Sequence, residues 1–196
     1  MQRLYPIQSR KMFPLKTVTA TQDCLVVRPL LRKEKSLVQG FLFHMSDSVD
    51  HISNQKSMTR AFATSIAEQS DCKGYVIEDQ KEGVLAFLVG TRQVCSLLKA
   101  LKNSMESDRV KQEKFDQLNK NEMLAAFFCT RDLFYSKALQ SMFEAFFEAH
   151  VEEKNNFALI VDKYEDLVLS FLADMNMRKS HEAKSYVVIK KVPKTN

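Results

Sequence analysis

MLAAFFCT (residues 123–130) begins a run of five alternating segments, which continue with SKALQSMFEAFFEAHVEEK (136–154), FALIVDK (157–163), YEDLVLSFLADMNM (164–177) and SYVVIKK (185–191). Three of them carry short apolar or β-branched runs bounded by polar residues, which predict strands. In the two longer segments, apolar residues recur at intervals of three and four, as in amphipathic helices. The strand runs are apolar on both faces, which indicates a central sheet covered by helices. This stretch therefore predicts a strand, helix, strand, helix, strand unit of an α/β fold.

The residues before this unit extend the same pattern of strands and helices. Pro29 ends a first predicted strand, and Gly83 lies at a turn that favours a positive φ. The predicted elements are a strand at 24–30, helices at 33–45 and 58–66, and a β-hairpin with strands at 74–79 and 83–90. Together with the later segments, they predict a mixed central sheet with helices on both faces.

The length of 196 residues fits one α/β domain, which we assign to residues 23–192. Residues 1–22 form a basic N-terminal arm with four basic and no acidic residues, and residues 193–196 form a tail. Within the domain, the sequence of 91–120 predicts a helix followed by a charged surface excursion, which is a usual place for specificity. This segment is a candidate contact site for a protein partner, and a merely solvated helix is the alternative.

The composition excludes several classes of protein. Hydrophobic residues make up 45% and charged residues 27% of the chain, as in ordinary globular proteins and unlike disordered ones. No apolar run reaches the roughly 20 residues that span a bilayer. Only four glycines are present and none follows Gly90, so the chain has neither a Walker A loop nor a dinucleotide-binding fingerprint. Basic residues outside the arm are interspersed with acids, which gives no specific indication of nucleic-acid binding.

The cysteines are widely spaced and form no CxxC pair, so we expect reduced thiols and no zinc site. They are Cys24, Cys72, Cys95 and Cys129. The histidines show no metal-ligand spacing either, so no metal cofactor is expected. Reduced cysteines predict an intracellular protein, located in the cytoplasm. The basic, acid-free arm leaves import into an organelle as the alternative.

Three local segments, VVRPL (26–30), GYVIEDQKEGVLAFLVG (74–90) and FLADMNM (171–177), carry a resemblance to a known family. They are similar, in this order, to the first strand, to the second and third strands, and to the segment before the terminal hairpin of the GNAT superfamily of acetyl-CoA-dependent N-acyltransferases. The resemblance covers residues 23–192. It implies a GNAT-like mixed sheet of about seven strands with helices on both faces, with FALIV central and SYVVIKK antiparallel beside it.

In that family the fourth strand diverges from the fifth, and the pantetheine arm of an acyl-CoA binds to the exposed backbone. The pyrophosphate binds at the start of the next helix, where the motif is Gln or Arg, two residues, Gly, one residue, and Gly or Ala. This chain has Leu133, Ser136 and Ala138 there, so only the last position matches and the resemblance implies weak binding of acetyl-CoA or another acyl-CoA. The residues that it assigns to this ligand are Phe128, Cys129, Thr130, Arg131, Ser136, Lys137, Ala138 and Leu139.

Acyl transfer needs a base for the amine, stabilisation of an oxyanion and departure of the thiolate. Glu122, Glu78 and Asp162 lie at predicted strand ends and are candidate bases, with solvated charge at a strand end as the plainer interpretation of each. The family commonly has a proton-donating tyrosine where this chain has Leu172, which cannot donate. An acyl-cysteine at Cys129 is a further hypothesis, although an inert buried cysteine is the more common case.

Two functions follow from these residues and from the resemblance. The first is a divergent GNAT-type acyltransferase that moves an acetyl or acyl group from acyl-CoA to the amine of a small molecule or peptide. The alternative is a pseudoenzyme with a GNAT-like fold, which binds a ligand or a protein without efficient catalysis. Because a fold does not give a function, a ligand-binding assay is the observation that separates the two.

Overall fold

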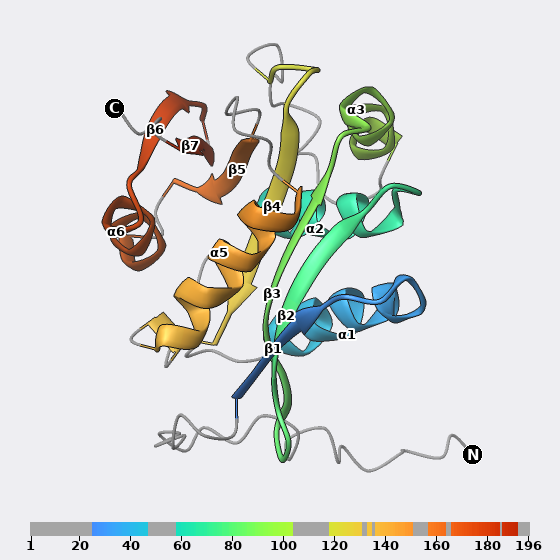
Figure 1. Ribbon diagram of the computed structural model, residues 1–196. Helices are drawn as coiled ribbons and strands as arrows, with labels where there is room; N and C mark the ends of the chain where they lie inside the picture. Colours follow the sequence, from blue (N-terminus) through green and yellow to red (C-terminus); the bar gives the residue numbers. More distant parts are fainter. Residues whose placement is uncertain are drawn as a thin grey trace, which may run out of the picture.

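The computed structural model describes residues 25–46, 58–103, 118–130, 133–134, 136–150, 157–163, 166–184 and 186–191. These residues form a mixed sheet of seven strands flanked by helices (Figure 1). The strands are β1 Leu25–Pro29, β2 Lys73–Asp79, β3 Gly83–Thr91, β4 Met123–Cys129, β5 Phe157–Asp162, β6 Met177–Glu182 and β7 Tyr186–Lys191. The helices are α1 Lys35–Ser46, α2 Met58–Glu68, α3 Val94–Asn103, α5 Lys137–His150 and α6 Asp166–Asp174, with the short 3-10 helix η3 Arg32–Glu34 before α1.

The strand order in the sheet is β1-β2-β3-β4-β5-β7-β6. β1 to β4 form one antiparallel half, and β5, β7 and β6 form a second antiparallel half. The two halves meet where β4 and β5 pair in parallel. The FALIV strand therefore lies inside the sheet with β7 antiparallel beside it, which confirms both predictions about these strands.

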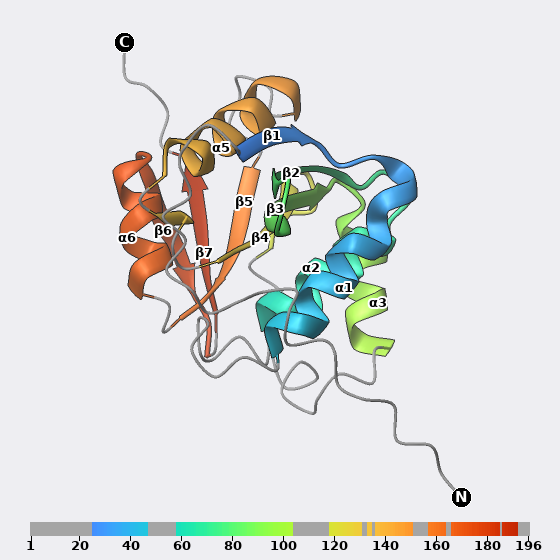
Figure 2. The same cartoon turned by 90° about the horizontal axis from the view of Figure 1, so that it is seen from below.

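Helices cover both faces of the sheet (Figure 2). α1, α2 and α3 pack on one face, where their apolar side chains share a core with Leu124, Ala126 and Phe128 of β4. α5 and α6 pack on the other face, in a core with Ala125 and Phe127. Because side chains alternate between the faces of a strand, a strand covered on both sides is apolar at every position, as MLAAFFC is. The predicted α/β class is confirmed.

The chain between α6 and β7 differs from the prediction. A helix was predicted through Met177, but α6 ends at Asp174 because Asn176 adopts a left-handed φ of 57°. Asparagine tolerates this conformation, which commonly ends helices. Met177 instead begins β6, an edge strand whose residues MRKSHE are mostly exposed and form no apolar run.

β6 pairs with β7, and an exposed ion-pair cluster lies at its end. The Glu182 carboxylate lies 2.6 Å from the ammonium groups of both Lys163 and Lys179. Hydrogen bonds from Lys163 and then Lys179 lower the pKa of the Glu182 carboxyl to about 2, because they favour its charged form. The contact with Lys163 joins the end of β6 to the residue that follows β5, and it requires an ionised carboxylate.

Parts of the predicted organisation lie outside the described residues. These are the N-terminal arm at 1–22, most of the charged excursion after α3 (104–117) and the tail at 193–196. Inside the described ranges, α3 confirms the predicted helix, and the φ of +80° at Gly83 confirms the predicted hairpin turn. No helix in these ranges has both the length and the apolar character needed to cross a bilayer.

Candidate functional site

The pairing between β4 and β5 stops partway along both strands. Only three residue pairs join them, and the last is Ala125 with Leu159. Beyond this pair β4 remains bonded to β3 and β5 to β7, and the ladder between β4 and β5 does not continue. The two ribbons diverge there in Figure 1. We call the facing stretches, 126–129 and 160–162, the β4–β5 opening.

The start of α5 follows the end of β4 and is capped by Ser136. Its hydroxyl donates to the Leu133 carbonyl over 2.9 Å and accepts from the Leu139 amide over 3.4 Å. The next two amides, of Lys137 and Ala138, lie in the first helical turn and have no partner within the helix. The structure thus brings these four predicted residues together in one turn, and the exposed Lys137 adds a positive charge to it. This turn can bind an anion through two amides and one ammonium group.

The end of β4 offers its backbone rather than its side chains. The Phe128 ring is buried on the α1–α3 face, stacked on Phe87 at 5.4 Å between ring centroids. The Cys129 side chain is buried on the opposite face, which favours the inert interpretation of this thiol over an acyl-cysteine. Thr130 donates its amide to the Leu85 carbonyl of β3 over 2.9 Å. Arg131, also predicted for this site, lies outside the described residues.

An aromatic cluster of Phe127, Phe134, Phe143 and Phe171 packs against the opening on the face covered by α5 and α6. The Phe134 ring lies 6.2 Å from Phe127 and 5.8 Å from Phe171, measured between centroids. Phe171 in turn lies 5.7 Å from Phe143 and 6.3 Å from Phe127. The cluster therefore connects β4, the turn before α5, α5 and α6 by ring contacts.

The sequence did not indicate Phe134 or Phe171 as residues of the site, although Phe171 lies on the apolar stripe of its predicted helix. The family motif drew attention to Leu133 in the turn, but the next residue carries the ring that reaches across to α6. The available signal was the aromatic composition, since the chain has 14 phenylalanines and no tryptophan. That signal gives no position, so only the tertiary structure identifies the cluster.

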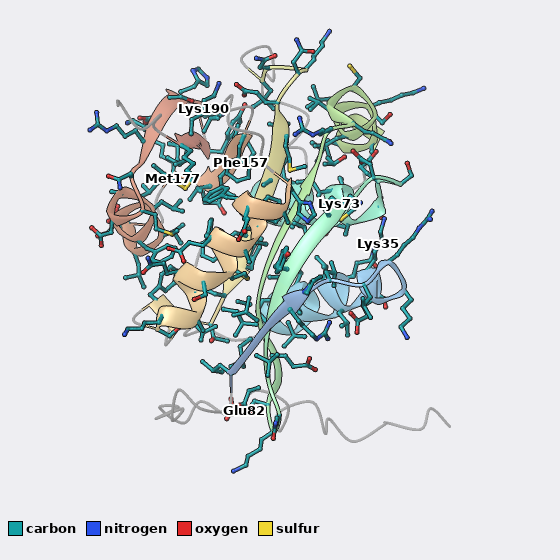
Figure 3. All side chains as sticks on the ribbon, in the orientation of Figure 1. Lys35, Lys73, Glu82, Phe157, Met177 and Lys190 are labelled. Carbon is teal, nitrogen blue, oxygen red and sulfur yellow. The ribbon has the colours of Figure 1, made fainter. Side chains whose placement is uncertain are left out.

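The three candidate bases do not meet in one site. Glu122 precedes β4 and its carboxylate lies 2.5 Å from the Lys190 ammonium, at the end of the sheet where Figure 3 shows Lys190. That end is roughly 20 Å along β4 from the start of α5, at about 3.3 Å per residue. Glu78 on β2 is paired with Arg28 at 2.7 Å, near the β1 edge. Asp162 alone lies at the opening, where β5 ends, and its side chain is buried.

Asp162 faces the α1–α3 side of the sheet, opposite the aromatic cluster. Ala158 and Ile160 belong to the core on that side, and alternation along β5 gives Asp162 the same direction. Counted from the last pair, Asp162 on β5 and Phe128 on β4 are both three residues further along. The two residues therefore lie across the opening from each other, Phe128 on the β4 edge and Asp162 on the β5 edge. Among the described residues, no three His, Cys, Asp or Glu side chains are grouped so that they could hold a metal ion.

The helix after β5 offers no proton donor at the position that the family comparison indicated. Leu172 of α6 is fully buried, in the core on the α5–α6 face. A buried aliphatic side chain in this position packs against the sheet and takes no part in proton transfer. The thiolate of a bound acyl-CoA would therefore have to leave without an acid from Leu172.

A pocket of about 380 Å³ lies at the other end of β4, beside Met123 and the last turn of α5. Its charged groups have both signs, and Asp71 is already bonded to the Thr91 hydroxyl and to the Arg92 amide. Burial, and then the charge of Lys73, lower the pKa of His150 in its wall. Because the pocket is far from the β4–β5 opening, we do not assign it to the same site.

No family model matches the sequence, and no curated protein matches it. Among solved structures, the fold is similar to that of SsHAT, with a TM-score of 0.58 and 10% identity over 85% of this chain and 97% of that one. A GCN5-related N-acetyltransferase from Kribbella flavida matches with a TM-score of 0.49 and 8% identity, over 87% and 98% of the two chains. NAA60 of Arabidopsis thaliana in complex with acetyl-CoA matches with a TM-score of 0.49 and 9% identity, over 86% and 99%. By its strand order and its β4–β5 opening, this chain has the fold of the GNAT superfamily.

Proposed function

We propose that the protein binds an acyl-CoA at the β4–β5 opening and transfers the acyl group to an amine. The observation that carries the proposal is the end of the β4–β5 ladder after Ala125 and Leu159. Beyond it the facing backbone edges at 126–128 and 160–161 lie outside the β4–β5 ladder, and they can bond the amide groups of a pantetheine arm as a strand would. The capped start of α5, with Lys137, can hold the pyrophosphate. Because the glycines of the family motif are absent, we expect weak binding.

In the proposed reaction, the amine nitrogen attacks the thioester carbonyl carbon and an oxyanion forms on the carbonyl oxygen. Backbone amides of β4 at the opening stabilise that charge, and the oxyanion collapses with cleavage of the carbon–sulfur bond. The proton lost by the amine passes to Asp162, directly or through a water molecule. The departing thiolate takes a proton from solvent, because Leu172 cannot supply one.

Calorimetry with CoA and acetyl-CoA tests the binding step. Ser136→Asp places a negative charge beside the phosphates while keeping a side chain that caps helices well, so we expect about a tenfold loss of affinity without unfolding. Ser141→Asp, at an exposed position further along α5, is the matched control and leaves the affinity unchanged. If the wild-type protein does not bind CoA, or if both variants weaken binding equally, this site assignment is wrong.

Release of free thiol from acetyl-CoA, with a pool of polyamine, amino-acid and peptide acceptors, tests the catalytic step. Asp162→Asn removes the proposed base and lowers the rate by about 10²-fold or more, with CoA affinity retained. An unchanged rate in that variant removes Asp162 from the mechanism. Turnover that depends on an acceptor amine is the result that the proposal requires.

A second function, a binding module without catalysis, is favoured by one specific observation. Leu172 is fully buried where the resemblance to the family implies a proton donor, so nothing at that position assists departure of the thiolate. CoA binding without acceptor-dependent thiol release would select this second function. Absence of both would exclude acyl-CoA as the ligand of this fold.

A further inference from the structure

On the α5–α6 face, buried aromatic side chains pack over the end of β4, beside the β4–β5 opening. Phe127 projects from β4 two residues beyond the last pair with β5, into the core on that face. The Phe134 ring meets it edge-on, with an interplanar angle of 82°, and meets Phe171 of α6 at 73°. One ring thus joins the β4 side of the opening to the helix that follows β5. Phe134 is only 8% exposed.

We infer that Phe134, held by Phe171, occupies the place of the ligand's pantetheine arm, so that an acyl-CoA must displace this ring in order to bind. The inference rests on the proposed function, since it takes the β4–β5 opening as the acyl-CoA site. It makes Phe134 and Phe171 the residues that set affinity for the thioester. A ligand with enough contacts along the opening and at the start of α5 can displace the ring, whereas a bare acyl thioester cannot.

Phe134 is the movable member of the aromatic cluster because of where it is attached. Phe127 is fixed in the strand by the β3–β4 ladder, and Phe143 lies in the middle of α5. Phe134 lies in a short turn, in which the Leu133 amide donates to Thr130 over 3.1 Å and the Ser136 amide donates to Leu133 over 2.9 Å. Moving the ring out of the core costs its two ring contacts and its burial.

Cys129 provides a readout that does not depend on any ligand. Its side chain is fully buried at the end of β4, in the same core as Phe127 and Phe134. A protein in which the other three cysteines are replaced by serine carries this thiol alone. Its rate of modification by a thiol reagent reports how often the core at the opening is exposed to solvent.

Phe134→Ala in this single-cysteine protein tests the position of the ring. We expect Cys129 to react about tenfold faster or more, because two aromatic contacts and the cover they provide are lost. The matched control is Phe147→Ala on α5, since Phe147 is equally buried at 7% exposure and contacts Phe157 at the start of β5. We expect Phe147→Ala to change the rate of Cys129 modification less than twofold. Equal acceleration in both variants would mean general loosening and would overturn the inference, as would no acceleration in Phe134→Ala.

CoA titrations of the same proteins complete the test. We expect Phe134→Ala, and independently Phe171→Ala, to bind CoA about tenfold more tightly than the wild type, because the ligand no longer has to displace the ring pair. If both variants bind CoA only as tightly as the wild type, or more weakly, the inference is overturned and the proposed function stands. If Cys129 is exposed in Phe134→Ala but neither protein binds CoA, the ring covers the opening as inferred and acyl-CoA is the wrong ligand, so the proposed function fails.

Discussion

Replacing Lys190 by methionine distinguishes a structural role of Glu122 from a catalytic one. The Glu122 carboxylate is nearly buried, with a side-chain exposure of 8%, and its Oε1 lies 2.5 Å from the Lys190 Nζ. Breaking a fully buried ion pair by removing one partner costs about 3–5 kcal/mol, because the other charge is left uncompensated. Since the Lys190 side chain is 35% exposed, water can partly replace it, and we expect a loss of about 2 kcal/mol of unfolding free energy.

The assay is a double-mutant cycle with Lys190→Met, Glu122→Gln and the combined variant. Because the chain lacks tryptophan, urea unfolding is best followed by far-ultraviolet circular dichroism. We expect the unfolding free energy of the combined variant to be higher, by about 1 kcal/mol or more, than the value obtained by adding the two single losses. Additivity within about 0.3 kcal/mol would refute the structural role. Loss of acyl transfer in Glu122→Gln at unchanged stability would make Glu122 the base instead of Asp162.

Three further outcomes follow from the structure. Gly74→Ala should lower the unfolding free energy by about 1–3 kcal/mol, because an added Cβ would lie 2.9 Å from the carbonyl oxygen of Leu88; an unchanged melting temperature contradicts this. Glu182, whose pKa is lowered to about 2 by its two lysines, should stabilise the fold fully above its ordinary pKa of 4.5 and lose this contribution as the pH falls from 4.5 to 2. If NMR shows that the Glu182 carboxyl titrates with a midpoint near 4.5, Glu182 makes no such contribution to stability. Leu172→Tyr should destabilise the core by about 1–3 kcal/mol without raising acyl transfer, with Leu172→Met as the mild control; faster thiol release in the tyrosine variant would show that a proton path is still in place.

Most of the fold could be predicted because buried strands and striped helices leave a periodic record in the sequence. The β4 residues MLAAFFC are apolar throughout since both of their faces are covered, and the pattern states this directly. β6 left no such record, because an edge strand with exposed side chains needs no apolar residues. The end of α6 was also missed. It depends on the left-handed backbone at Asn176, and asparagine is compatible with a helix as well as with this turn.

The candidate site was only partly predictable. Residues around the end of β4 and the start of α5 are close in sequence, so the resemblance could assign Phe128 and Ser136 to one site. The pairing of Glu122 with Lys190 joins residues 68 positions apart, and the contact of Phe134 with Phe171 joins a turn to a distant helix. In neither pair does the local sequence around one residue predict which residue it contacts. Long-range pairs of this kind decide which carboxylate is available for chemistry, and they come only from tertiary packing.

The three-pair junction of β4 with β5 also determines how the molecule can deform. Within each antiparallel half of the sheet the ladders run over five to seven residue pairs, whereas only three pairs join the two halves. Rotation of one half of the sheet relative to the other about the β4–β5 junction is therefore expected to break the fewest backbone bonds. A ligand that bonds to both edges of the opening would join the two halves of the sheet. Its binding would stiffen the whole sheet, so that the ligand would contribute to the stability of the fold.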